Sequence, residues 1–74
     1  MATRYDNNTC LVKIGQTAGE IWHKLDQEGP QSYSRLVKDL ESPRDTVMQA
    51  LGWLAREEKV KIHETNRGRQ VSLY

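Results

Sequence analysis

The side chains best suited to recognise another molecule fall into two clusters in the second half of the chain. The first places charged, polar and flexible side chains within six consecutive positions: Arg44, Thr46, Met48 and Gln49. The second consists of two arginines around a glycine: Arg67 and Arg69. Arginine can bind guanine or a phosphate, and glutamine can bind adenine through two hydrogen bonds. The clusters form a candidate surface for double-stranded DNA, although Asp45 would repel phosphate; a plain solvated surface is the alternative.

Trp53 and Arg56 offer a different chemistry, because tryptophan and arginine are over-represented at the centres of protein interfaces. A tryptophan in a small domain is more often covered by the rest of its own chain. Here the cover would come from the N-terminal segment through Leu11 or from the strand that bears Tyr74. If Trp53 is exposed instead, we expect a protein interface flanked by Met48 and Arg56.

Residues that could catalyse a reaction are few and badly spaced for it. His23 and His63 are separated by 39 residues, and neither has a neighbouring set of cysteines or carboxylates with metal-ligand spacing. Cys10 is the single cysteine, so it cannot form an intramolecular disulfide, and no base lies near it in sequence. We therefore expect no enzyme, no metal site and no cofactor.

An amphipathic helix is predicted from Ile14 to Glu28, since its apolar residues recur at helical steps and share one face. That face holds five residues: Ile14, Ala18, Ile21, Trp22 and Leu25. Trp22 is accordingly expected in the core.

Both ends of this helix carry sequence signals. Thr17 and Glu20 have the spacing of a capping box, and a start near Gly15 is the alternative. Gly29-Pro30 predicts the end of the helix, because glycine accepts the left-handed cap and proline cannot continue the hydrogen-bond ladder.

A short second helix is predicted after an extended link at residues 31–33. Ser34 is expected to cap it, and its apolar face holds Leu36, Val37 and Leu40. A tight turn at Glu41-Ser42 then leads into a longer third helix. Short helix, tight turn and longer helix together indicate a helix-turn-helix arrangement.

The third helix has the strongest start signal in the chain. Ser42 is expected as its N-cap, Pro43 as its first helical residue and Asp45 as the acidic residue three after the cap. The helix is expected to run to about Glu58. Its buried stripe is predicted to hold Val47, Ala50, Leu51, Leu54 and Ala55. Successive 100° turns place the following residues on the opposite, free side: Asp45, Thr46, Gln49, Trp53 and Arg56.

The hydrophobic period then changes from 3.6 to 2, which predicts a β-hairpin. Val60 and Ile62 alternate with polar residues in the first strand, and Val71 and Leu73 do so in the second. Their apolar sides coincide only if even positions face odd positions, as a turn of two or four residues provides. The turn is expected within residues 66–69, where Asn66 and Gly68 best tolerate a positive φ. A further extended piece is predicted at Cys10, Val12 and Ile14.

Three strings of the chain carry a resemblance to known proteins. Residues 29–36, Gly-Pro-Gln-Ser-Tyr-Ser-Arg-Leu, and residues 42–47, Ser-Pro-Arg-Asp-Thr-Val, resemble the starts of the second and the recognition helix in winged-helix transcription regulators. Residues 50–57, Ala-Leu-Gly-Trp-Leu-Ala-Arg-Glu, with Lys59-Val60 after them, resemble a small, functionally uncharacterised bacterial family of winged helix-turn-helix proteins. The likeness implies an α+β, mainly α fold: a winged helix-turn-helix with a three-helix core and a C-terminal β-hairpin wing.

This resemblance also implies a function. In winged helices that bind DNA, the recognition helix, here about residues 43–57, lies in the major groove, and the wing, here residues 66–69, touches the backbone or the minor groove. We therefore expect a DNA-binding transcription regulator. The alternative is a protein-interaction module that keeps the winged-helix shape and uses the Trp53 face.

Length and charge fit a small binding domain. Seventy-four residues are enough for one domain, 1–74, in which residues 1–10 are expected to be a flexible or loosely packed leader. The net charge is only +1, and the part after Glu41 holds six basic and four acidic residues, a small asymmetry toward nucleic acid.

Location and partners follow from the same composition. No apolar stretch approaches the roughly 20 residues that span a bilayer, and a lone cysteine suits a reducing compartment, so the cytoplasm is expected. The candidate partners are double-stranded DNA, a protein partner or a second copy of the chain, with no membrane and no metal.

Overall fold

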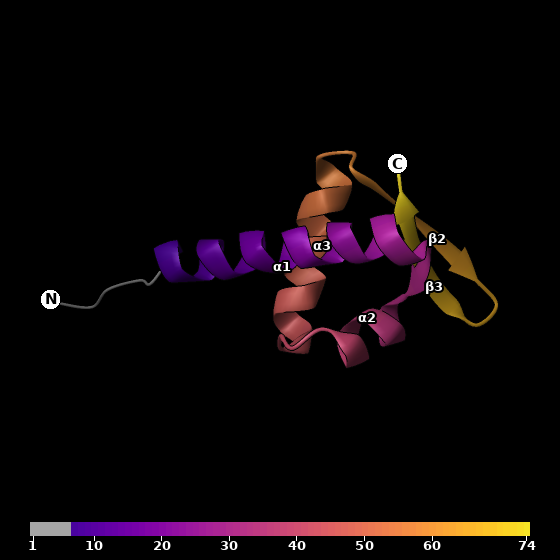
Figure 1. Cartoon of the computed structure of the whole chain (residues 1–74), viewed down its shortest axis with the longest axis horizontal. Coiled ribbons are helices and arrows are strands. Elements are labelled where there is room, and N and C mark those ends of the chain that lie inside the picture. Colours follow the sequence, from indigo (N-terminus) through magenta and orange to yellow (C-terminus); the bar gives the residue numbers. More distant parts are fainter. Residues whose placement is uncertain (1–6) are drawn as a thin grey trace, which may run out of the picture.

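The computed structural model describes residues 7–74, which form three helices and a three-stranded antiparallel sheet (Figure 1). The elements in chain order are α1 (Asn7–Glu28), β1 (Gln31–Ser32), α2 (Tyr33–Asp39), α3 (Arg44–Arg56), β2 (Val60–Thr65) and β3 (Gly68–Leu73). This arrangement confirms the predicted three-helix core with a C-terminal hairpin wing. Of the leader expected at residues 1–10, residues 1–6 lie outside the described part, and residues 7–10 belong to α1.

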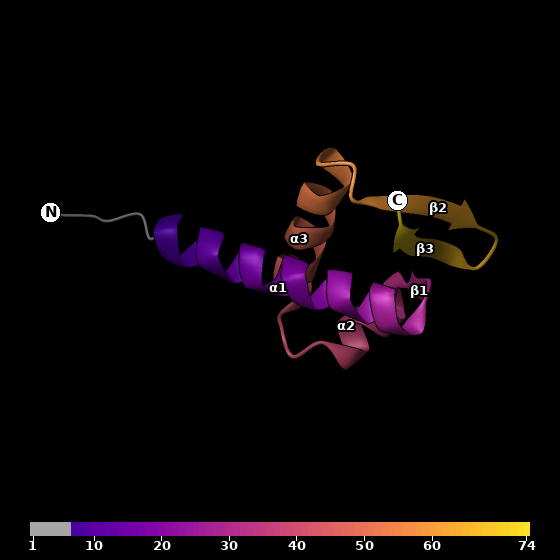
Figure 2. The ribbon, with the colours of Figure 1, turned by 45° about the horizontal axis from the view of Figure 1, so that its top comes forward.

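Helix α1 begins at Asn7, about two turns before the predicted start at Ile14. The capping box predicted at Thr17 and Glu20 is therefore wrong, as are the start near Gly15 and the extended piece predicted at residues 10–14. The physical reason is that no proline interrupts residues 7–14, and Leu11 continues the helical spacing of Ile14. The first turns of α1 extend past α3 in both overall views (Figures 1 and 2).

The end of α1 is confirmed at Gly29-Pro30. Gly29 has a φ of 82°, in the left-handed region that glycine enters without a Cβ clash, and its N–H donates to the Leu25 carbonyl at 2.9 Å. The chain then turns into β1 and α2.

Helix α2 is capped by Ser32 and not, as predicted, by Ser34. Ser32 has an extended backbone because it pairs with β3, and this is the geometry that an N-cap needs. Its hydroxyl accepts a hydrogen bond from the Arg35 N–H at 3.1 Å. Leu36 is buried, and Val37 and Leu40 pack against the core as predicted.

Helix α3 differs from its prediction at both ends. Pro43 takes the N-cap position, and no side chain caps the helix, so the predicted capping role of Ser42 is wrong. The helix ends at Arg56, sooner than the predicted end near Glu58. Glu58 adopts a left-handed φ of 59°, and the next N–H, of Lys59, donates back to the Leu54 carbonyl at 2.9 Å.

The sheet has the strand order β1-β3-β2 and contains one strand that the sequence patterns did not predict (Figure 2). Val60 faces Leu73 and Ile62 faces Val71, so even positions face odd positions across a two-residue turn, as predicted. Gly68 has the expected positive φ, 131°, whereas Asn66 does not. The unpredicted strand is the link at Gln31 and Ser32, which pairs with the outer side of β3.

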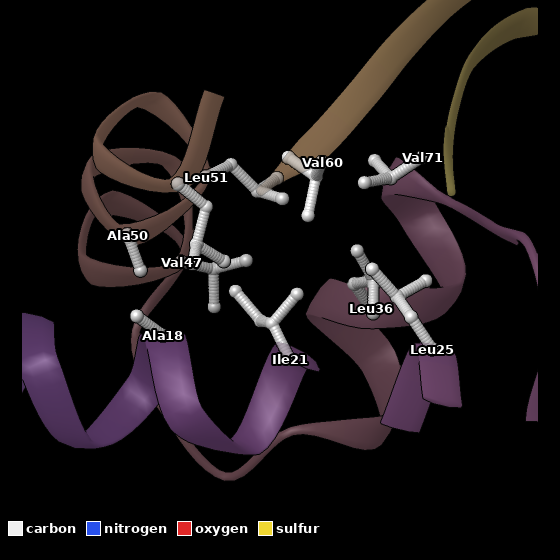
Figure 3. Close-up of a cluster of buried hydrophobic side chains, with 10 residues drawn as sticks. Ala18, Ile21, Leu25, Leu36, Val47, Ala50, Leu51, Val60 and Val71 are labelled. Carbon is white, nitrogen blue, oxygen red and sulfur yellow. The ribbon is translucent and has the colours of Figure 1, made fainter. Parts of the chain in front are cut away.

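The core lies where α1, α2, α3 and the sheet meet (Figure 3). Its buried side chains are Ala18, Ile21, Leu25, Leu36, Val47, Ala50, Leu51, Leu54, Val60 and Val71. Small side chains at Ala18 and Ala50 allow α1 to cross close to α3. Four of the five residues in the predicted stripe of α3 are fully buried, and Ala55 is half-buried, so this stripe is confirmed.

Candidate nucleic-acid interface

Arg44 and Gln49 are the exposed members of the first predicted cluster. Arg44 is the first residue of α3, directly after the turn that Pro43 sets, and Gln49 lies one and a half turns further along. Neither side chain packs in the core, so both can reach a molecule placed against the outer side of α3.

Thr46 and Met48 are held more tightly. Met48 is half-buried and packs against the core cluster. Thr46 is half-buried and lines a hollow together with Gln16 and Thr17 of α1. Helical spacing predicted Thr46 on the free side of α3, but the crossing α1 partly covers it. The exposed surface of α3 is therefore narrower than the predicted one.

The wing tip presents Arg67 and Arg69. The Thr65 hydroxyl donates to the Gly68 carbonyl at 2.9 Å and accepts from the Arg67 N–H at 3.2 Å, which holds the backbone of the two-residue turn. Both arginine side chains are exposed. The structure thus presents basic groups on a hairpin that projects away from the helices (Figure 1).

The two wing arginines differ in their surroundings. Arg69 forms an ion pair with Glu64 at 3.3 Å, and its guanidinium lies 5.9 Å from the centroid of the Tyr33 ring. Among residues 9–74, whose side chains the structure describes, Arg67 has no ion pair, and the same holds for Arg44 and Arg56. Arg44, Arg56 and Arg67 therefore keep their charge available for a partner.

Trp53 is not covered, although the residues expected to cover it lie nearby. It lines one hollow with Leu11 and a second with Tyr74, yet 47% of its surface is exposed. Trp22 was predicted in the core, and this is wrong: it is 36% exposed on the rim of the second hollow. The helical spacing placed Trp22 at the edge of the apolar face, and only the packing of α3 and β3 decides whether that edge is covered.

The residues considered for catalysis lie apart. His63 is on β2, with its Nε2 3.3 Å from the Ser72 hydroxyl of β3, and His23 stacks edge-on against Trp22 on α1. Cys10 is exposed near the start of α1. Within the described part of the chain, no three or more His, Cys, Asp or Glu side chains gather as metal ligands would. None of the helices in that part is both long and apolar enough to cross a bilayer.

These elements define a winged helix-turn-helix domain: α2, the turn and α3 form the helix-turn-helix, and β2 and β3 form the wing. The chain belongs to the winged helix-turn-helix domain family DUF2582, whose model matches residues 6–73.

Relatives of the chain support this assignment. An uncharacterised protein of the archaeon Methanocaldococcus jannaschii, MJ1608, is 45% identical over 53 residues, which are 68% of this chain and 74% of that protein. The bacterial origin implied by the sequence resemblance is not confirmed, since this relative is archaeal.

Two solved structures are similar in fold. Protein BT2368 from Bacteroides thetaiotaomicron superposes with a TM-score of 0.72 and 31% identity, over 82% of this chain and 74% of that one. The ArsR family transcriptional regulator RHA00566 superposes with a TM-score of 0.64 and 19% identity, over 99% of this chain and 77% of that one. At 19% identity, the similarity to the second structure shows a shared fold alone.

Proposed function

We propose that the chain is a DNA-binding winged-helix domain that acts as a transcription regulator. The observation that carries the proposal is the placement of exposed basic side chains, with no ion pair to any side chain of residues 9–74, on both elements that would meet DNA: Arg44 on α3 and Arg67 on the wing. The similar fold of an ArsR family transcriptional regulator supports the same role. This role would place the chain in the cytoplasm with its DNA and requires no catalytic group.

The roles of the side chains follow from their chemistry. In the major groove, Gln49 would hydrogen-bond to adenine, and Arg44 would bind guanine or a phosphate. Arg67 and Arg69 would attract backbone phosphates from the wing. Thr46 and Met48 would contact the base edges only through their exposed parts, since both are half-buried.

The small excess of basic residues limits the expected affinity for DNA. The part of the chain after Glu41 holds six basic and four acidic residues, and Asp45 stands beside Arg44 in the first turn of α3. Such a small excess predicts non-specific binding with a Kd of roughly 10⁻⁴ M at physiological salt and tighter binding at low salt. Specific recognition would then depend on the bases that Gln49 and Arg44 contact.

A titration with duplex DNA tests the proposal. Amide signals of residues 44–49 and 65–69 should shift at low salt, and the shifts should weaken as salt is added. Arg67→Gln should flatten the plot of log affinity against log salt by about 0.9, the value for one phosphate contact. Lys38→Gln, which removes the same charge from the exposed end of α2, is the matched control and should leave the slope unchanged. No shift in either segment at low salt would reject DNA binding.

The exposed Trp53 favours a second candidate, a protein interface built on Trp53 and Arg56. A second copy of the chain is the partner most easily tested. Sedimentation should then show a dimer that Trp53→Ala converts to a folded monomer. A wild-type monomer at all concentrations excludes a homodimer through this face.

A further inference from the structure

A groove of about 640 Å³ lies between α1, the last turns of α3 and the end of the sheet. Its walls are aromatic: Trp22 comes from α1, Trp53 from α3, and Tyr74 follows β3. All three residues are partly or largely exposed, at 36%, 47% and 69% respectively. The volume falls within the range of roughly 300–1,000 Å³ that small-molecule sites occupy.

Two glycines of α1 keep the floor of this groove open. Gly15 and Gly19 lie one turn apart and both line it. A Cβ added at either position would meet no atom within 4 Å, so the space above the helix backbone there is empty. A flat molecule can therefore approach the α1 backbone directly, with aromatic rings beside it.

The charged side chain that lines the groove is basic. Lys59 lines it, with its Nζ 5.7 Å from the centroid of the Trp53 ring, and Lys61 holds its Nζ 5.1 Å from the centroid of the Tyr74 ring. Neither lysine forms an ion pair within the described residues. No Asp or Glu side chain is among the residues described as lining the groove, and His23 also lines it. The groove therefore complements a negative charge.

We propose that this groove binds a small planar aromatic anion, of the class of the arene carboxylates. The ring would stack between the tryptophans over Gly15 and Gly19, and the carboxylate would meet the Lys59 ammonium at the rim. A small ligand is the occupant that we infer, because the volume of the groove is that of a small-molecule site and a single cation, Lys59, lines it. The proposal does not depend on DNA binding.

A ligand in this position would touch both elements that carry the candidate DNA interface, α3 and the wing, at residues outside that interface. The groove is lined by Trp53 and Leu54 of α3 and by Leu73 of β3, which is the second strand of the wing. A bound ligand would therefore affect the packing of the wing against α3.

Titration with 2-naphthoate, followed through the indole N–H signals of Trp22 and Trp53, tests the proposal. Both signals should shift with saturation, and neutral 2-naphthamide should bind about tenfold more weakly, since it lacks the charge that Lys59 meets. Lys59→Gln should remove that preference by lowering the affinity for 2-naphthoate to that for 2-naphthamide. Equal binding of the two probes, or no shift of the indole signals, would overturn the proposal.

Two glycine variants test whether the ligand binds in the groove or elsewhere on the surface. Gly19→Leu should fill the floor and weaken 2-naphthoate by about tenfold or more. Gly52→Leu on α3 is the matched control, because its Cβ also meets empty space and Gly52 does not line the groove. Unchanged binding in Gly19→Leu, with native circular dichroism, would reject this site. Sedimentation showing that the groove is filled by a second copy, which naphthoate does not displace, would also reject it.

Discussion

The hydroxyl groups of Thr17 and Ser42 lie 3.1 Å apart and join the middle of α1 to the turn before α3. Both residues have the sequence spacing of helix N-caps, yet neither caps a helix. Thr17 is buried, with 3% of its surface exposed, so its hydroxyl needs a partner inside the protein. The pair thereby helps to set where α3 starts relative to α1.

A double-mutant cycle should detect this hydrogen bond. Thr17→Val and Ser42→Ala each remove one hydroxyl, and the coupling between them should be about 0.5–1.5 kcal/mol in the free energy of unfolding. Urea unfolding of the wild type, both single variants and the double variant measures it. Effects that add without coupling would mean that the two hydroxyls contribute independently, each through another contact or water.

Glu58 should be replaceable by glycine with a gain in stability. It has a φ of 59° just beyond the end of α3, a conformation that strains any residue with a Cβ. Glu58→Gly should therefore raise the free energy of unfolding by about 1 kcal/mol. Glu57→Gly is the matched control: its φ is −83°, so glycine there should lower stability by about 0.4–1 kcal/mol. A change in the free energy of unfolding with the same sign in both variants would contradict this explanation.

Gly19 and Gly29 should respond in opposite directions to alanine, although neither position is crowded. Gly19 lies inside α1, so Gly19→Ala should stabilise the protein by about 1 kcal/mol through helix propensity. Gly29 has a φ of 82°, so Gly29→Ala should destabilise it by about 1–2 kcal/mol. Thermal unfolding of both variants provides the comparison, and a destabilised Gly19→Ala would show that the surface over α1 is not open.

The ion pair between Lys24 and Asp39 should make stability depend on pH at both extremes. Lys24 Nζ lies 3.0 Å from Asp39 on α2 and 3.1 Å from Glu28 on its own helix. The hydrogen bond from Lys24, helped by Arg35, lowers the pKa of Asp39 below its ordinary 3.8. The hydrogen bonds to Asp39 and Glu28 raise the pKa of Lys24 above its ordinary 10.5.

The sign of each effect follows from linkage. The contribution of Asp39 is present above its unfolded pKa and is lost as pH falls through its lower folded pKa. The contribution of Lys24 is present below its unfolded pKa and is lost as pH rises through its higher folded pKa. Urea unfolding from about pH 5 down to about pH 2 should therefore show a steeper loss in the wild type than in Lys24→Met. Lys13→Met is the control. If the free energy of unfolding fell equally steeply with pH in all three proteins, the ion pair between Lys24 and Asp39 would not contribute to the pH dependence.

The fold could be predicted from local spacing because each signal lies within a few residues. The stripe of Val47, Leu51 and Leu54 and the even-to-odd register of the hairpin are properties of neighbouring positions, and both are confirmed. Of the candidate DNA-binding residues, the exposed position of Gln49 also follows from helical spacing, whereas Arg44 is exposed as the first residue of α3.

Other features depended on contacts between distant segments. Ser32 caps α2 because β3 holds it in an extended conformation, and no local signal distinguishes it from Ser34. The exposure of Trp22 and the half-burial of Thr46 follow from where α1 crosses α3. The groove joins aromatic residues at positions 22, 53 and 74, which no sequence motif connects.

The amino-acid sequence by itself determined the three-helix order, the hairpin and the apolar side of each of these elements, since these depend on periodicity and on glycine or proline at the ends. Only the tertiary structure decided which hydroxyls cap a helix and which aromatic rings stay open to solvent. A hydroxyl or an aromatic ring at the edge of an apolar face is stable either covered or exposed. Its final state is set by the neighbour that packs beside it, and that neighbour comes from another part of the chain.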